Sequence, residues 1–106
     1  MRCRKWEVWY ARFKFEDSND IKNRPVIITG VGDAYILSVK VTTHEPRKGY
    51  EGEYRIKYWK EAGLRNESTA RLSKRLKLID SDLIHKIGDL HPVDIIEIQR
   101  RILRSS

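Results

Sequence analysis

The chain has 106 residues, a net charge of +7 and a sequence pI of about 9.7. This length suits one domain, residues 1–106, with a single core, and no run of roughly 20 apolar residues is present to span a membrane. The single cysteine, Cys3, excludes an internal disulfide, and the basic start lacks the apolar stretch of a signal peptide, so we expect a cytoplasmic protein without membrane contact.

β-Strand patterns dominate the first half of the chain. Residues 8–13 are aromatic and β-prone, and the polar residues 17–20 predict a long loop after them. A second strand is expected over residues 24–31, with Pro25 at its start, where a missing N–H is tolerated. Residues 32–33 then predict a tight hairpin turn.

The third predicted strand, residues 35–43, alternates between an apolar and a polar face. The face expected to meet the core holds Tyr35, Leu37, Val39, Val41 and Thr43. The face expected to meet solvent or a groove holds Ile36, Ser38, Lys40, Thr42 and His44. The alternation therefore assigns Thr42, not Thr43, to the open side.

The second half predicts a loop over residues 45–52, a fourth strand over 54–59, one or two strands over 69–79, and a short strand over 84–87. Residues 80–82 predict a turn, or a helical turn capped by Asp80 or Ser81.

A helix is expected to begin at Pro92, with His91 as its cap and Asp94 in its first turn. Its apolar residues form a broad stripe made of Val93, Ile95, Ile96, Ile98, Ile102 and Leu103. The whole pattern predicts a mostly β fold, in which a strongly bent antiparallel sheet forms a small barrel closed against the C-terminal helix.

Positive charge is concentrated between residues 55 and 77, where eight Lys and Arg residues accompany two Glu residues. Three interleaved aromatics, Tyr54, Tyr58 and Trp59, favour a stacking surface for single-stranded nucleic acid, although a solvated face is the simpler alternative. The candidate RNA-binding residues are Lys40, Arg47, Lys48, Arg71 and Lys74.

Arg24 and Thr42 are the candidate catalytic pair, because the predicted strands place them at two adjacent strand ends. A permanently charged guanidinium beside a neutral hydroxyl suits an anion that gains charge during a reaction, such as a phosphate in RNA. His44 shares a face with Thr42 and belongs to the residue type that exchanges protons near neutral pH, with a solvated loop histidine as the alternative. No P-loop, H-E-x-x-H or Cys/His cluster is present, so we expect no metal and no cofactor.

Five segments stand in a recognisable order along the chain. They are residues 7–15, residues 23–28, residues 41–43, Trp59 with residues 62–64, and residues 87–90. Together they resemble the MazF/PemK family of toxin endoribonucleases, whose catalytic Thr or Ser corresponds to Thr42. Trp6 departs from the family pattern, which usually has glycine there, and no acidic residue before Arg24 clearly matches the acidic helper of some members.

The resemblance implies an SH3-like barrel that forms a homodimer and serves as the toxin of a type II toxin–antitoxin system. It further implies sequence-selective, metal-independent cleavage of single-stranded RNA to 2′,3′-cyclic phosphate and 5′-hydroxyl ends, and inhibition by an antitoxin protein. Two alternatives remain open: a non-catalytic SH3-like barrel that binds nucleic acid, and a CcdB-like toxin that acts on gyrase.

Overall fold

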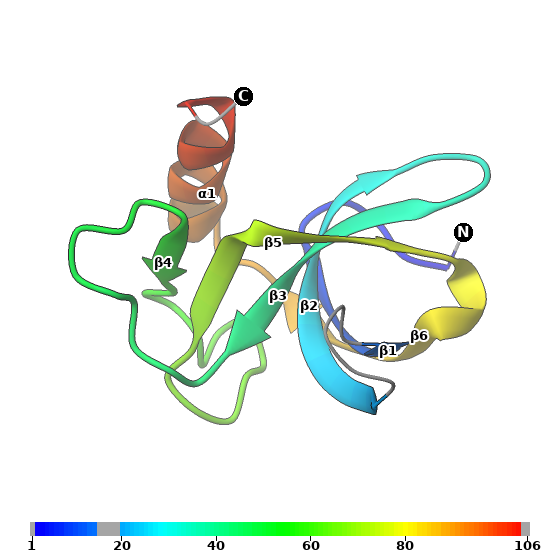
Figure 1. The fold of residues 1–106 in the computed structure, drawn as a ribbon. Helices are drawn as coiled ribbons and strands as arrows, with labels where there is room; N and C mark the ends of the chain where they lie inside the picture. Colours follow the sequence, from blue (N-terminus) through cyan, green and yellow to red (C-terminus); the bar gives the residue numbers. More distant parts are fainter. Residues whose placement is uncertain (1, 15–19, 105–106) are drawn as a thin grey trace.

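A computed structural model describes residues 2–14 and 20–104 of the chain, so the predicted loop over 17–20 lies outside the described residues except for Asp20. One six-stranded sheet and a C-terminal helix make up the described structure (Figure 1). The elements are β1 (Glu7–Lys14), β2 (Ile21–Val31), β3 (Ile36–Thr42), β4 (Glu53–Arg55), β5 (Thr69–Leu78), the 3-10 turn η1 (Asp80–Asp82), β6 (Leu83–Asp89) and α1 (Pro92–Arg104). This confirms the predicted mostly β fold with a C-terminal helix.

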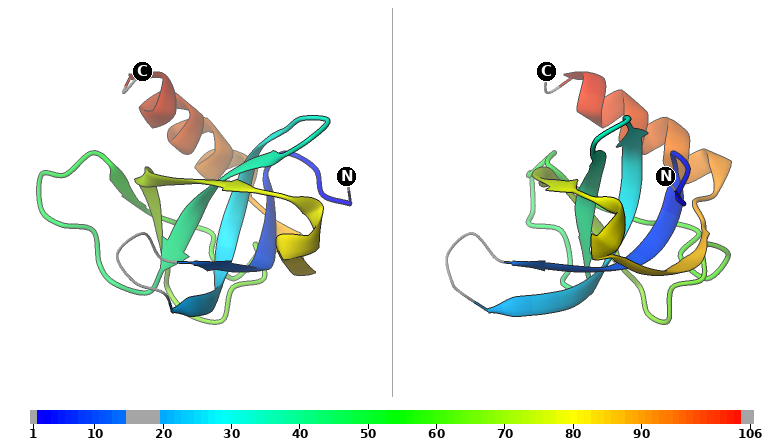
Figure 2. Two further views of the ribbon diagram at one scale, coloured as in Figure 1. Left: turned by 45° about the vertical axis from the view of Figure 1, so that its right-hand side comes forward. Right: turned by 90° about the vertical axis from the view of Figure 1, so that its right-hand side faces the viewer.

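The strands follow the order β4-β5-β3-β2-β1-β6, and every neighbouring pair is antiparallel. The sheet curls strongly, as both views in Figure 2 show, but β4 and β6 remain its two edges. The described strands thus form an open curled sheet, not the closed barrel that we expected. One bulge lies in β5, where the residue paired with β3 changes from Arg71 opposite Lys40 to Arg75 opposite Val39, and a bulge of this kind bends a continuous strand.

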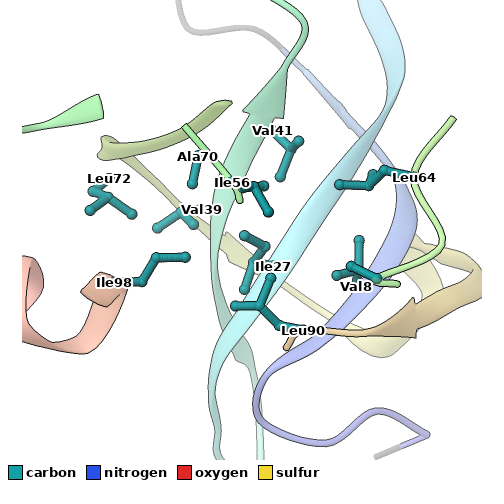
Figure 3. Packing of buried hydrophobic residues seen from close by; sticks show 11 residues of the cluster. Val8, Ile27, Val39, Val41, Ile56, Leu64, Ala70, Leu72, Leu90 and Ile98 are labelled. Atoms are coloured by element: carbon teal, nitrogen blue, oxygen red, sulfur yellow. The ribbon is translucent and has the colours of Figure 1, made fainter. Parts of the chain in front are cut away.

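Apolar clusters cover both faces of the sheet. One contains Val39 and Val41 and packs against the helix residue Ile98 (Figure 3), and the other contains Ile36. The predicted faces of β3 are therefore correct only toward its C-terminal end. On the hairpin side Ile36 and Ser38 are buried, whereas the predicted core residues Tyr35 and Leu37 are 40% and 47% exposed.

Thr43 is also exposed, contrary to the prediction that it meets the core. Thr43 comes directly after the last residue of β3. Within β3, Val41 is the final residue that belongs to the apolar core. The alternation of the strand holds, but the core ends before it reaches Thr43.

A buried carboxylate ends β4 early. Asp94 of α1 is fully buried and accepts hydrogen bonds from the backbone N–H groups of Lys57 and Tyr58, each at 2.9 Å, and from the Tyr54 hydroxyl. These N–H groups are thereby withdrawn from the sheet, so the predicted strand over 54–59 is wrong beyond Arg55. Burial, followed by the hydrogen bond to Asp94, raises the pKa of Tyr54.

Two glycines let the segment after β4 dock directly on β6. A Cβ on Gly88 would lie 2.3 Å from the carbonyl oxygen of Ala62, and one on Gly63 would lie 2.5 Å from that of Ile87. Gly63 also has a φ of +88°, in the left-handed region that favours glycine. Two motifs that are separated in sequence thus meet at one backbone contact.

The helix begins at Pro92 as predicted, and the Nδ1 atom of His91 accepts the N–H of Val93 at 3.1 Å. Its apolar stripe is only partly covered: Ile98 is buried, whereas Ile96 and Leu103 are 57% and 68% exposed. No helix in the described part of the chain has the length and apolarity needed to cross a membrane.

The structure corrects the predicted cap of the helical turn at residues 80–82. The cap of η1 is Ile79, whose N–H donates to Asp82 at 2.9 Å, whereas Asp80 binds the Arg2 side chain at 3.0 Å.

Trp6 stands where the family pattern usually has glycine. Its φ is +72°, a conformation that glycine adopts without strain and tryptophan does not.

Candidate active site

Arg24 and Thr42 come together where β2 and β3 separate. The pairing of the two strands ends at Val26 and Lys40, and the same register continued by two residues sets Arg24 opposite Thr42. Both line a cavity of about 70 Å³, which is also lined by Phe13, Lys40, Val41 and Arg71. β2 begins at Ile21, so Arg24 and Pro25 lie within the strand, where β2 pairs with β1 alone.

A larger recess of about 390 Å³ adjoins this cavity. It is lined by Thr42, His44, Glu45, Arg47, Glu53, Thr69 and Arg71. Because Thr42 and Arg71 line both spaces, we treat the two as one continuous surface and call it the basic groove. Six of the eight residues selected from the sequence line this groove. The other two do not: Lys48 is exposed in the loop before β4, and Lys74 is half-buried on β5.

One buried carboxylate organises the cations of the groove. Glu53, 7% exposed, accepts the backbone N–H of Arg47 at 2.9 Å, and its other oxygen lies 3.4 Å from Nε of Arg71. The backbone hydrogen bond from Arg47 is the main cause that holds the pKa of Glu53 below its ordinary value. Glu53 thus stays ionised and orients the two arginines. Nothing in the residues around Glu53 indicates this role, because Glu53 resembles any solvated charge near a loop.

Two residues of neighbouring strands hold the segment that carries Thr42 and His44. The carbonyl oxygen of His44 accepts the Thr69 hydroxyl at 2.6 Å and the Arg55 guanidinium at 3.2 Å. The N–H of His44 donates to Oγ1 of Thr42 at 3.4 Å. These contacts fix the backbone after β3, and Arg55 and Thr69 were not recognised in this role from the sequence.

Arg24 is exposed, and its guanidinium donates to the carbonyl oxygen of Asn23 at 2.9 Å. Since Arg24 belongs to neither apolar cluster, the core does not depend on its side chain. Among the described residues, no group of three or more His, Cys, Asp or Glu side chains is arranged to hold a metal ion.

A curled antiparallel sheet, a C-terminal helix and a basic groove where two central strands part together define a small β protein of the MazF-like class. The chain belongs to the family of PemK-like, MazF-like toxins of type II toxin–antitoxin systems, whose family model matches residues 4–105. This confirms the family suggested by the ordered sequence segments.

Solved structures share the fold at low sequence identity. A mycobacterial endoribonuclease in complex with its cognate antitoxin matches with a TM-score of 0.71 and 13% identity, over 95% of this chain and 91% of that one. The Mycobacterium tuberculosis toxin MazF-mt6 matches with a TM-score of 0.71 and 19% identity, over 93% and 94% of the two chains. Another mycobacterial endoribonuclease matches with a TM-score of 0.72 and 13% identity, over 99% of this chain and 92% of that one. None of the curated protein sequences compared with the chain matches it.

Proposed function

We propose that the protein is an endoribonuclease toxin that cleaves single-stranded RNA in the basic groove. The observation that carries this proposal is that Arg24 and Thr42 line one cavity together with the further cations Lys40 and Arg71. Membership of the toxin family supports it, and so does the fold shared with structures described as endoribonucleases. We propose that it acts in the cytoplasm, as a homodimer.

The chemistry that we propose uses the RNA's own 2′-hydroxyl as the nucleophile, without metal. Its oxygen forms a bond to the adjacent phosphorus, and the bond from phosphorus to the 5′-oxygen breaks. The proton leaves the 2′-hydroxyl for a base and a second proton reaches the 5′-oxygen, which yields a 2′,3′-cyclic phosphate and a 5′-hydroxyl. The added negative charge on the phosphorane needs preorganised donors, the role that we assign to Arg24, Arg71 and the Thr42 hydroxyl.

His44 is the residue that we propose for proton transfer, because it lines the groove with Thr42 and its backbone is held by Arg55 and Thr69. Lys40 and Arg47 are proposed to bind flanking phosphates, and Lys48 and Lys74 to attract RNA from outside the groove. An antitoxin with an acidic segment would compete for the same cations.

The test is cleavage of an unstructured RNA in EDTA by the wild-type protein and by Arg24→Ala. We expect the variant to remain folded by circular dichroism and to cut about 100-fold more slowly, the typical cost of one lost donor to a transition-state anion. Arg12→Ala is the matched control, because Arg12 is an exposed strand arginine that lines neither part of the groove.

Equal cutting by Arg24→Ala and wild type would contradict the site. A wild-type protein that cuts no RNA, with or without added Mg²⁺, would instead favour the non-catalytic nucleic-acid-binding barrel or the toxin that acts on gyrase.

A further inference from the structure

A second, larger cleft is lined by residues that do not line the basic groove. Its volume is about 620 Å³, and residues of β1, β2 and β6 line it together with the segment before β5. We call it the aromatic cleft and define it by Tyr10, Pro25, Thr43, Asn66, Ser68 and His85. None of these residues belongs to the basic groove.

The two sites meet at adjacent residues. Arg24 lines the basic groove and Pro25 the aromatic cleft, and in the same way Thr42 lines the groove and Thr43 the cleft. Consecutive Cα atoms are about 3.8 Å apart, and successive side chains of a strand point to opposite faces. The residues that line the two spaces are therefore adjacent on both chain segments, which makes a nucleotide next to the reacting phosphate the nearest one to the cleft.

Stacked rings form one wall of the cleft. The rings of Tyr10 and His85 are nearly parallel, with an interplanar angle of 7° and 5.5 Å between their centroids. Tyr10 is half-buried in β1, whereas His85 is exposed on β6, the edge strand of the sheet. Each ring covers one face of the other, so the outer face of the exposed His85 ring is left as a flat surface of the kind on which single-stranded RNA stacks its bases.

Hydrogen-bonding groups also line the cleft. Thr43 and Asn66 are exposed there, and the Ser68 hydroxyl donates to the carbonyl oxygen of Asn66 at 2.7 Å. An amide and a hydroxyl supply both donors and acceptors, which is what the edge of a stacked base requires. Arg65 adds an exposed cation, whereas Lys86 is already paired with Glu7 and Asp89 at 3.0 and 3.2 Å.

The cleft is preformed by the glycine contact described above. Gly63 docks its backbone on Ile87 of β6, and Gly88 of β6 meets the carbonyl oxygen of Ala62. This contact fixes the segment that carries Asn66 and Ser68 relative to the strand that carries His85. A site that is already shaped loses less free energy in ordering its ligand than one that must form on binding.

We propose that the aromatic cleft binds the base of a nucleotide next to the cleaved phosphate and thereby sets part of the sequence preference. This inference rests on the proposed endoribonuclease function. A peptide segment of an antitoxin is the competing occupant, but an exposed ring with amide and hydroxyl groups in the same cleft fits a base better than an extended peptide.

The first experiment measures cleavage profiles on a randomised RNA pool. His85→Ala should lose the preference at one position beside the cut and raise KM about 10-fold, a typical loss for one stacked base, with kcat little changed. His85→Phe keeps an aromatic ring and should restore KM. Tyr35→Ala is the matched control, because Tyr35 is an exposed aromatic beside the hairpin turn of β2 and β3. There Nζ of Lys77 lies 4.2 Å from the centroid of the Tyr35 ring.

The second experiment does not depend on cleavage. Each of the four nucleoside 5′-monophosphates is titrated into the protein while the ring-proton NMR signals of His85, assigned by their loss in His85→Phe, are followed. Stacking should move these signals upfield, to different extents for different bases.

The outcomes separate the two proposals. RNA cleavage with an unchanged profile in His85→Ala, together with no ring shift, overturns the base site and leaves the nuclease standing. Ring shifts in a protein that cuts no RNA overturn the nuclease and leave base binding standing. If His85→Ala alters only the inhibition by an acidic antitoxin peptide, the cleft is a peptide site and the inference is wrong.

Discussion

The basic groove and the aromatic cleft are lined by neighbouring residues, Arg24 and Thr42 on one side and Pro25 and Thr43 on the other, and they are held in shape by different forces. In the groove, the buried carboxylate of Glu53 holds two arginines that would otherwise repel each other. In the cleft, stacked rings and a backbone contact through Gly63 set the shape, although Arg65 and Lys86 also line it. The groove thus depends on a counter-ion, whereas the cleft depends on close packing, and single substitutions can disturb one without the other.

The largest expected effect comes from the neighbouring threonines. Thr42→Ala should slow RNA cleavage about 100-fold, because it removes a hydroxyl donor from the groove. Thr43→Ala should instead change the base preference, with a loss of rate below about tenfold, because its side chain lines the cleft. Neither should unfold the protein, since Thr42 is half-buried and Thr43 is exposed.

Single-turnover cleavage rates and thermal unfolding curves distinguish the two variants. Equal losses of rate for Thr42→Ala and Thr43→Ala would show that groove and cleft act as one site.

Gly63→Ala should break the cleft while sparing the groove. The added Cβ meets the Ile87 carbonyl at 2.5 Å and the backbone has a φ of +88°, so we expect a loss of about 2 kcal/mol or more in unfolding free energy. Gly49→Ala is the matched control, because Gly49 has a φ of +75° with no heavy atom within 4 Å of the added Cβ. It should lose only about 1 kcal/mol.

Urea denaturation measures both glycine variants. Equal losses of unfolding free energy in the two variants would mean that the positive φ alone, and not the contact of Gly63 with β6, makes Gly63→Ala destabilising.

Glu53→Gln should weaken the groove while sparing the cleft. Loss of the charge that holds Arg47 and Arg71 should lower kcat/KM about tenfold, the equivalent of one charge-assisted hydrogen bond. Glu51→Gln removes the same charge two residues away, where the Glu51 carboxylate lies 3.5 Å from the Arg104 guanidinium of α1 and does not line the groove, and it should have little effect on the rate.

The difference in stability between the wild type and Glu53→Gln should also depend on pH. The pKa of Glu53 is lowered in the folded protein, so the wild-type carboxylate stabilises the fold above its unfolded pKa of about 4.3. That advantage over Glu53→Gln should shrink as the pH falls below this value and vanish once it passes the lowered native pKa. A stability difference that stays constant from neutral to acidic pH would contradict the assigned role.

Local patterns predicted much of the fold. Alternation from residue 35 to 44 and the hairpin at residues 32–33 specified β2 and β3, and Pro25 was compatible with a strand because β2 no longer pairs with β3 there. The helix cap at His91 could likewise be predicted from the sequence, because capping depends on residues close in sequence. The same local reasoning assigned Thr42 to the open face but misplaced Ile36, because alternation does not reveal that both faces of a sheet are covered.

By itself, the sequence determined the order of the strands along the chain, the helix and the toxin family, since each depends on short motifs or periodicity. It also selected Arg24 and Thr42 as candidates, which the structure brings to one cavity. Only the tertiary structure decided that Glu53 holds Arg71, that Asp94 ends β4 and that Tyr10 stacks on His85. Each of these pairs joins residues 18 or more positions apart, and their contact depends on how the sheet curls and the helix docks. Local propensity carries no information about such contacts, because burial and charge pairing arise only when distant elements pack.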